Sequence, residues 1–232
     1  MKNNIFFEES LFEEGKIAEN LKKLGATTIK YNNFSKTVLD LDSKMAQVFE
    51  RRSGKYITFD IKKECKKLVL ELANSLNNLI ANKTKILLVG LGNRFVIADS
   101  LGENTLSKVT NPIIFKFTPS VKSVTNIDSI VLIKSVVDSI KPTAVIIVDS
   151  LATRDISKLA SSIQLTDSGI VAGGGVSKSD KLLNSSTLGV PVIAVGVPLI
   201  VGIKGDYFCP HQIDIFVQNY SNIIAKSINM LE

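Results

Sequence analysis

Ile86-Leu87-Leu88-Val89 is an apolar run bounded by Lys85 and Gly90, and it decides the fold class. An uninterrupted apolar run followed by a turn is typical of a strand buried on both faces of a sheet, and we expect this strand to be central. Two further runs of the same kind occur at residues 144–148 and 192–197. The chain therefore has three candidate core strands.

Helical patterns separate these strands. Residues 65–79 and 127–140 space their apolar side chains as on one face of a helix, and Lys141-Pro142 provides a stop signal for the second of them. Strands that alternate with helices of this length form crossover units. The sequence thus predicts an α/β fold of three layers, αβα, in which helices cover both faces of a mainly parallel or mixed sheet.

We expect a single globular domain overall. Residues 1–53 are predicted to be an N-terminal helical segment, with a helix over 8–24, and are a candidate pro-segment. Residues 54–232 are predicted to form the α/β catalytic domain. This part opens with an alternating strand at 55–61 and closes with a helix at 213–231.

Composition and charge argue against several classes of protein. Of 232 residues, 45% are apolar and 22% charged, as expected for a globular chain. No run approaches the ~20 apolar residues that cross a bilayer, so we expect a cytoplasmic protein without membrane contact. The net charge of +6 is scattered, which argues against direct nucleic-acid binding. Cys65 and Cys209 lie in no metal-ligand spacing, and no metal site or cofactor is expected.

Two aspartates follow predicted core strands. In open α/β sheets, ligands bind where loops leave the carboxyl ends of the strands. One such loop, residues 90–102, contains Asp99, and another begins at Asp149, directly after Val148. Repulsion and burial would raise one pKa, so that one carboxyl keeps its proton up to roughly pH 5 to 7 while the other is ionised. One could activate water and the other protonate a leaving group, as in peptide hydrolysis.

Other interpretations of these segments stay open. Asp99 and Asp149 could each simply cap the start of a helix. The turn at 90–92 resembles the beginning of a phosphate-binding loop, but the dinucleotide fingerprint requires glycine where the chain has Phe95. The segment Cys209-Pro210-His211 brings a thiol near the only histidine, and it is more simply a turn before the last helix. Residues 164–178, rich in Gly, Ser and Asp, are predicted to be a functional loop.

Several motifs resemble those of the germination proteases of spore-forming bacteria, and they occur in the same order. The loop Gly90-Leu91-Gly92-Asn93, followed by Asp99-x-Leu101-Gly102, resembles the signature loop of that family. Residues 149–154, 162–169 and 187–198 match further family segments, so the resemblance covers about Tyr56 to Pro198. The chain ends soon after the expected core, so it resembles a short form of these proteases.

This resemblance implies an endopeptidase that cuts small acid-soluble spore proteins. Asp99 and Asp149 stand at the positions of the two aspartates proposed as catalytic in the family. The resemblance also places Asn93, Arg154 and Asp167 beside the pair as substrate-binding residues, since their loops are expected to leave the sheet at the same edge. The implied partners are small protein substrates, with a homo-oligomer as an open alternative, and the implied location in a sporulating organism is the spore core.

Two alternatives stay open, and the first follows from a more distant resemblance. The Gly-x-Gly-Asn loop and the acidic residues after two strands are similar to hydrogenase maturation endopeptidases, which have a phosphorylase/hydrolase-like sheet and a metal site. The first alternative is therefore a metal-dependent maturation endopeptidase, with Asp99 and Asp149 as ligands. The second is a catalytically silent relative that binds a protein partner or a small ligand in the same crevice.

Overall fold

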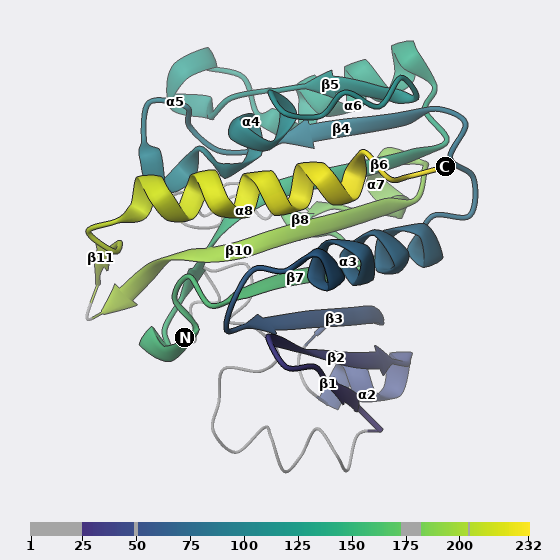
Figure 1. Cartoon of the computed structure of the whole chain (residues 1–232). Coiled ribbons are helices and arrows are strands. Elements are labelled where there is room, and N and C mark those ends of the chain that lie inside the picture. The colour runs from purple at the N-terminus through teal and green to yellow at the C-terminus, as the bar shows by residue number, and fades with distance from the viewer. Residues whose placement is uncertain (1–24, 49–50, 173–181, 204) are drawn as a thin grey trace.

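The computed structural model, shown in Figure 1, describes residues 25–48, 51–172, 182–203 and 205–232. The helix predicted over residues 8–24 lies outside this part of the chain, as do residues 173–178 of the loop predicted at 164–178. No helix in the described ranges is long and apolar enough to span a membrane.

One large sheet runs through the molecule, in the order β1-β2-β3-β7-β10-β6-β4-β5, with β11 paired to the far part of β10. A separate two-stranded ladder joins β8 to β9. The strands are β1 Thr27–Lys30, β2 Phe34–Leu41, β3 Gly54–Ile61, β4 Ile86–Gly90, β5 Ile114–Phe117, β6 Ala144–Thr153, β7 Ser162–Thr166, β8 Ile170–Val171, β9 Leu182–Leu183, β10 Val192–Ile203 and β11 Asp206–Phe208.

Only one half of the large sheet is parallel. β4 pairs in parallel with β5 and β6, and β6 pairs in parallel with β10. β7, β3, β2 and β1 extend the sheet in antiparallel fashion. Of the two predicted alternatives, a mixed sheet is confirmed and a mainly parallel one is wrong. The predicted loop at 164–178 is also wrong in its first part, because residues 164–166 belong to β7.

Helices cover both faces of the sheet, which confirms the three-layer αβα architecture. α3, α4 and α8 pack on one face, where Leu72, Leu101 and Ile224 share a buried apolar cluster, and Figure 1 shows α8 crossing that face beside α3. α6 covers the other face through Ile133 and Val137. The helical segments are α2 Ser43–Val48, α3 Lys66–Leu79, η1 Ile97–Asp99, α4 Leu101–Leu106, α5 Lys122–Thr125, α6 Ser129–Ile140, η2 Ile156–Lys158, α7 Ser185–Leu188 and α8 Ile213–Ile228.

The three apolar runs of the sequence form β4 and the buried parts of β6 and β10, as predicted. β4 is nevertheless not central, because only the short β5 separates it from the edge of the sheet. Its burial comes from the helices on its two faces. Leu88 packs in the same cluster as Leu101 of α4, and Val89 packs in the cluster that contains Ile133 of α6. A fully apolar run therefore indicates coverage on both faces, not a central position.

The described part of the N-terminal segment contains two strands, β1 and β2, and one short helix, α2, so this part is not the helical segment that was predicted. β1 carries the β-branched residues Thr27, Thr28 and Ile29, which favour strands. β1 pairs with β2, and β2 pairs with β3 along its whole length, from Phe34 opposite Ile61 to Leu41 opposite Gly54. A boundary after residue 53 therefore divides paired strands of one sheet. The pro-segment stays a prediction.

Candidate active site

Close glycine contacts allow the chain to reverse as it leaves β4. A Cβ on Gly90 would lie 2.7 Å from the carbonyl carbon of Gly102, so α4 can begin directly against the end of the strand. Gly92 has a φ of +102°, and a Cβ there would lie 2.0 Å from the main-chain oxygen of Asp99. No larger side chain fits this arrangement without movement of the backbone. The turn thus folds back on itself, so that Asp99 lies against Gly92.

Hydrogen bonds fix the carboxyl group of Asp99 in this turn. The backbone N–H of Asn93 donates to the main-chain oxygen of Asp99 at 3.0 Å and to its carboxylate Oδ2 at 2.8 Å. The backbone N–H of Asp99 in turn donates to the main-chain oxygen of Val96. Asp99 is the last residue of η1, and its carboxyl group accepts a hydrogen bond from the turn that precedes η1. The alternative that Asp99 caps the following helix is therefore wrong.

Asp149 lies inside β6, not directly after it. The strand continues to Thr153, so the alternative that Asp149 caps a helix is also wrong. β10 pairs with β6 on one side, with Gly196 opposite Asp149, and β4 pairs on the other side as far as Gly90 opposite Val148. Asp149 is half-buried, and the backbone N–H of Ser150 donates to its Oδ1 at 2.9 Å.

Neighbouring parallel strands carry the two aspartates to the same end of the sheet. The turn that holds Asp99 leaves β4 at Gly90, where the backbone N–H of Leu91 still donates to the main-chain oxygen of Val148 in β6. The next residue of β6 is Asp149. Because the carboxyl ends of parallel strands share one edge, this is the arrangement on which the hypothesis of a carboxylate pair depends. The catalytic roles of the two residues stay predictions.

Burial raises the pKa of the Asp99 carboxyl from an ordinary value near 3.8 to about 6. The hydrogen bond from the Asn93 backbone acts in the opposite direction, because it stabilises the ionised form, but its effect is smaller. A carboxyl group with a pKa near 6 can hold a proton in mildly acidic solution and release it near neutrality. This property is required of a general acid or base.

Two of the predicted substrate-binding residues, Asn93 and Arg154, lie at different distances along the chain from the candidate pair. Asn93 contacts Asp99 through its backbone, and its side-chain oxygen accepts from the backbone N–H of Phe95 at 3.0 Å. Arg154 is exposed and directly follows β6. It stands five residues beyond Asp149, which corresponds to roughly 16 Å along an extended strand. Asn93 thus belongs to the turn, whereas Arg154 lies at the far end of the strand.

Asp167, the third predicted substrate-binding residue, lies at the end of β7 that points away from the edge beyond Asp149. β7 is antiparallel to β10, and Thr166, the residue before Asp167, pairs with Ala194. Ala194 pairs with Ile147, so Asp167 follows β7 toward the amino end of β6 and away from the edge beyond Asp149. Its Oδ1 accepts from the backbone N–H of Lys55 at 2.7 Å. The prediction that its loop leaves at the shared edge is wrong, because residues 164–166 were assigned to a loop and instead belong to β7, which runs antiparallel to β10.

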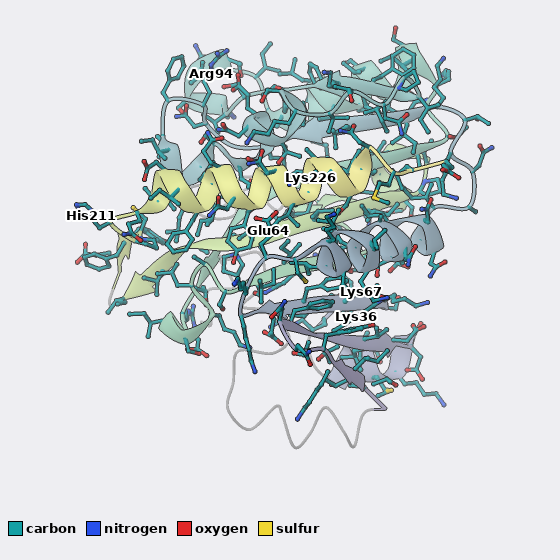
Figure 2. The ribbon with its side chains drawn as sticks, in the orientation of Figure 1. Lys36, Glu64, Lys67, Arg94, His211 and Lys226 are labelled. Atoms are coloured by element: carbon teal, nitrogen blue, oxygen red, sulfur yellow. The ribbon has the colours of Figure 1, made fainter. Side chains whose placement is uncertain are left out.

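His211 lies in the turn before α8, as the simpler interpretation predicted, and Figure 2 shows it at the end of the molecule near the start of that helix. Both His211 and Cys209 are exposed. Within the described ranges, no three His, Cys, Asp or Glu side chains form a group that could hold a metal ion.

A surface hollow lies at the opposite end of the sheet. It is lined by the segments that precede β4 and β5 and by the end of α8, at residues 81–84, 110–113, 229, 231 and 232. Polar groups in this hollow are already hydrogen-bonded to one another, since the side-chain oxygen of Asn229 accepts from the backbone N–H groups of Thr110 and Asn111. We therefore do not include this hollow in the candidate site.

Sequence reasoning missed two features of the turn at residues 90–102. The first is the close approach of Gly90 and Gly102, for which the paired glycines were the available signal. The second is the exposure of Phe95, Val96 and Ile97 next to Asp99. This exposure could have been predicted, because three successive apolar residues stand in a segment that was assigned to a loop.

The fold and the candidate site define an α/β protein whose chemistry is expected at the carboxyl ends of neighbouring parallel strands, where the chain carries two aspartates. The chain belongs to the germination protease family, because the model of that family matches residues 4–206.

Individual relatives agree with this assignment. The chain is 32% identical over 234 aligned positions to the germination protease of Bacillus licheniformis, covering 87% of this chain and 63% of the relative. It is 32% identical over 225 positions to that of Oceanobacillus iheyensis, covering 83% and 61%. The chain thus spans about three-fifths of the length of these relatives.

A solved NiFe hydrogenase maturation protease, HycI from Thermococcus kodakarensis, is 18% identical with a TM-score of 0.46, covering 66% of this chain and 98% of that one.

Proposed function

We propose that this chain is an endopeptidase that cuts small acid-soluble spore proteins through Asp99 and Asp149. The observation that carries the proposal is the half-buried carboxyl of Asp99, which has a pKa of about 6 and lies on the turn beside the strand that carries Asp149. Membership in the germination protease family supports the choice of substrate.

The two carboxyl groups would divide the proton transfers of hydrolysis. A water molecule held by ionised Asp149 attacks the carbonyl carbon of the peptide bond, and its proton passes to the Asp149 carboxylate. Neutral Asp99 gives its proton to the departing amide nitrogen as the carbon–nitrogen bond breaks. Proton exchange between Asp149, solvent and Asp99 then restores the starting state. Asp99 has the role of the acid because burial favours its neutral form.

The test is cleavage of a purified small acid-soluble spore protein by the full chain and by Asp99→Asn and Asp149→Asn. These substitutions keep the shape of the side chain and remove its charge, and each should lower kcat/KM at least about 100-fold. Asp138→Asn is the matched control, since Asp138 is an exposed carboxylate on α6, and this variant should keep full activity. Circular dichroism should show that all three variants are folded.

Three outcomes would contradict the proposal. Full activity in a folded Asp99→Asn or Asp149→Asn variant would exclude the carboxylate pair. Loss of cleavage with a chelator, followed by recovery with a divalent ion, would favour the metal-dependent alternative, with the aspartates as ligands. Binding of the spore protein without any cleavage by the unmodified chain would favour the catalytically silent relative.

A further inference from the structure

Three successive apolar side chains are exposed on the turn that carries Asp99. The exposed fractions are 75% for Phe95, 47% for Val96 and 54% for Ile97. Single exposed apolar residues are common on protein surfaces, but a contiguous exposed run indicates a contact surface. We call these three side chains the apolar turn. Figure 2 shows Arg94, the residue directly before it, at the periphery of the molecule.

Polar contacts, and not burial of its own side chains, hold the apolar turn in place. The side chain of Asn93 accepts from the backbone N–H of Phe95 at 3.0 Å, and the main-chain oxygen of Asn93 accepts from the N–H of Val96 at 3.0 Å. The main-chain oxygen of Ile97 accepts from the hydroxyl of Ser100 at 2.8 Å. The backbone is therefore fixed while the side chains stay available. A surface ordered before binding loses little conformational entropy when a ligand docks.

Arg94 adds a further restraint on one side of the apolar turn. Its guanidinium lies 5.9 Å from the centre of the Phe95 ring and 3.2 Å from a carboxylate oxygen of Glu103 in α4. A cation at this distance over an aromatic face is attracted to the ring. The exposed ring of Phe95 is therefore oriented from the α4 side.

The position of the apolar turn determines what can occupy it. One hydrogen bond joins it to Asp99, because the Asp99 N–H donates to the main-chain oxygen of Val96, and the preceding residue Asn93 donates its backbone N–H to the Asp99 carboxyl. Any occupant is thus held next to that carboxyl. A second copy of the chain would cover the site, whereas an extended segment of a protein substrate would be brought to it. Val124 of α5 and Val131 of α6 are also exposed, but within the described residues no hydrogen bond links either of them to Asp99 or Asp149.

We propose that the apolar turn docks an apolar side chain of an extended substrate segment and thereby positions the neighbouring peptide bond at Asp99. This inference rests on the proposed function. It assigns Phe95, Val96 and Ile97 to substrate specificity, a role that the two aspartates do not fill. Phe95 contributes the largest exposed apolar surface and should matter most.

The test compares Phe95→Ser, Val96→Ser and Ile97→Ser with the unmodified chain in cleavage of a small acid-soluble spore protein. Phe95→Ser should raise KM about tenfold, which is the loss expected when a docked apolar side chain is removed, and the other two should raise it less. In all three, kcat and the pH dependence of cleavage should stay unchanged, because the backbone contacts of Asp99 remain. Val131→Ser, at a position on α6 with the same exposed fraction as Ile97, 54%, is the control and should leave KM unaltered.

Other results would overturn docking. An unchanged KM in all three variants would exclude it, and a lower kcat at constant KM would show that the turn acts only by positioning Asp99. An oligomer that Phe95→Ser converts to monomers in sedimentation would identify a second copy as the occupant. If the unmodified chain does not cleave, the proposed function fails, but docking is still tested by fluorescence anisotropy with the labelled spore protein. Weaker binding by Phe95→Ser would support docking, and equal binding would exclude it.

Discussion

One backbone N–H, that of Asn93, donates to both the main-chain oxygen and the carboxylate of Asp99, at 3.0 and 2.8 Å. This double contact closes the turn after β4 and aims the Asp99 carboxyl back at the end of the strand. Burial within the turn makes ionisation of that carboxyl costly, while the single N–H offsets only part of the cost. The structure of the turn therefore leads directly to predictions about proton affinity.

Cleavage should depend on pH through Asp99. If its neutral form supplies the proton to the leaving nitrogen, kcat/KM should fall as pH rises through about 6, because burial has raised the pKa of this carboxyl to that value. Above that value the decline should approach tenfold per pH unit. The measurement is kcat/KM for a spore-protein substrate between pH 4.5 and 8, with circular dichroism to confirm folding. A flat profile across pH 6 would remove Asp99 from the role of acid.

Replacement of Asp99 by asparagine should stabilise the fold near neutral pH while it abolishes activity. Because the pKa is higher in the folded chain than in the unfolded chain, the folded chain binds more protons between about pH 3.8 and 6, and its stability falls as pH rises through that window. Asparagine avoids this cost and can still accept from Asn93. Since tenfold in proton affinity equals about 1.4 kcal/mol, the gain at pH 7 should reach at most roughly 3 kcal/mol.

The measurement for this stability prediction is urea unfolding of the full chain and of Asp99→Asn at pH 4, 5.5 and 7. The difference in free energy of unfolding should be close to zero at pH 4 and largest at pH 7. Asp138→Asn, at an exposed position, should show no comparable trend. A difference that stays constant over the range would mean that burial does not raise the pKa of Asp99.

Substitution of Gly92 by alanine should damage both stability and activity. The backbone there has a φ of +102°, and the new Cβ would lie 2.0 Å from the Asp99 main-chain oxygen and 2.9 Å from its carboxylate. Gly189 is the matched control, because its φ is +73° and nothing lies within 4 Å of a Cβ built on it. Gly189→Ala should cost about 1 kcal/mol from backbone strain alone. Gly92→Ala should cost clearly more in urea unfolding and should lose cleavage; equal effects would exclude the clash.

The sequence predicted the parts of the fold that local patterns determine. The apolar run 86–89 is typical of a strand covered on both faces and forms β4, and the helical spacing over 65–79 matches α3. What it could not show was strand direction, since β7 was short and lay partly in a segment rich in Gly and Ser. Without β7, the antiparallel half of the sheet could not be placed.

The same limit explains the mixed outcome for the candidate site. Asp99 and Asp149 could be assigned to one edge of the sheet because each is tied in sequence to a parallel core strand, and the carboxyl ends of such strands share an edge. Arg154 and Asp167 depend on how far β6 extends and on the direction of β7, which are set by pairing between distant segments. The pKa of Asp99 likewise depends on burial, which only the folded turn provides.

Asp167 should contribute to stability and not to catalysis. Its Oδ1 accepts from the backbone N–H of Lys55 at 2.7 Å, at the start of β3, and its position at the end of β7 directs it toward the amino end of β6 and away from Asp149. Asp167→Ala should lower the free energy of unfolding by about 1 kcal/mol, because a hydrogen bond that begins a strand is lost. Asp167→Asn keeps the acceptor oxygen and should behave nearly as the unmodified chain. Urea unfolding and kcat/KM per folded molecule, measured on both variants, check whether Asp167 acts on stability alone.

A large fall in kcat/KM for Asp167→Ala at unchanged stability would instead show that Asp167 contacts the substrate, as the family resemblance implies.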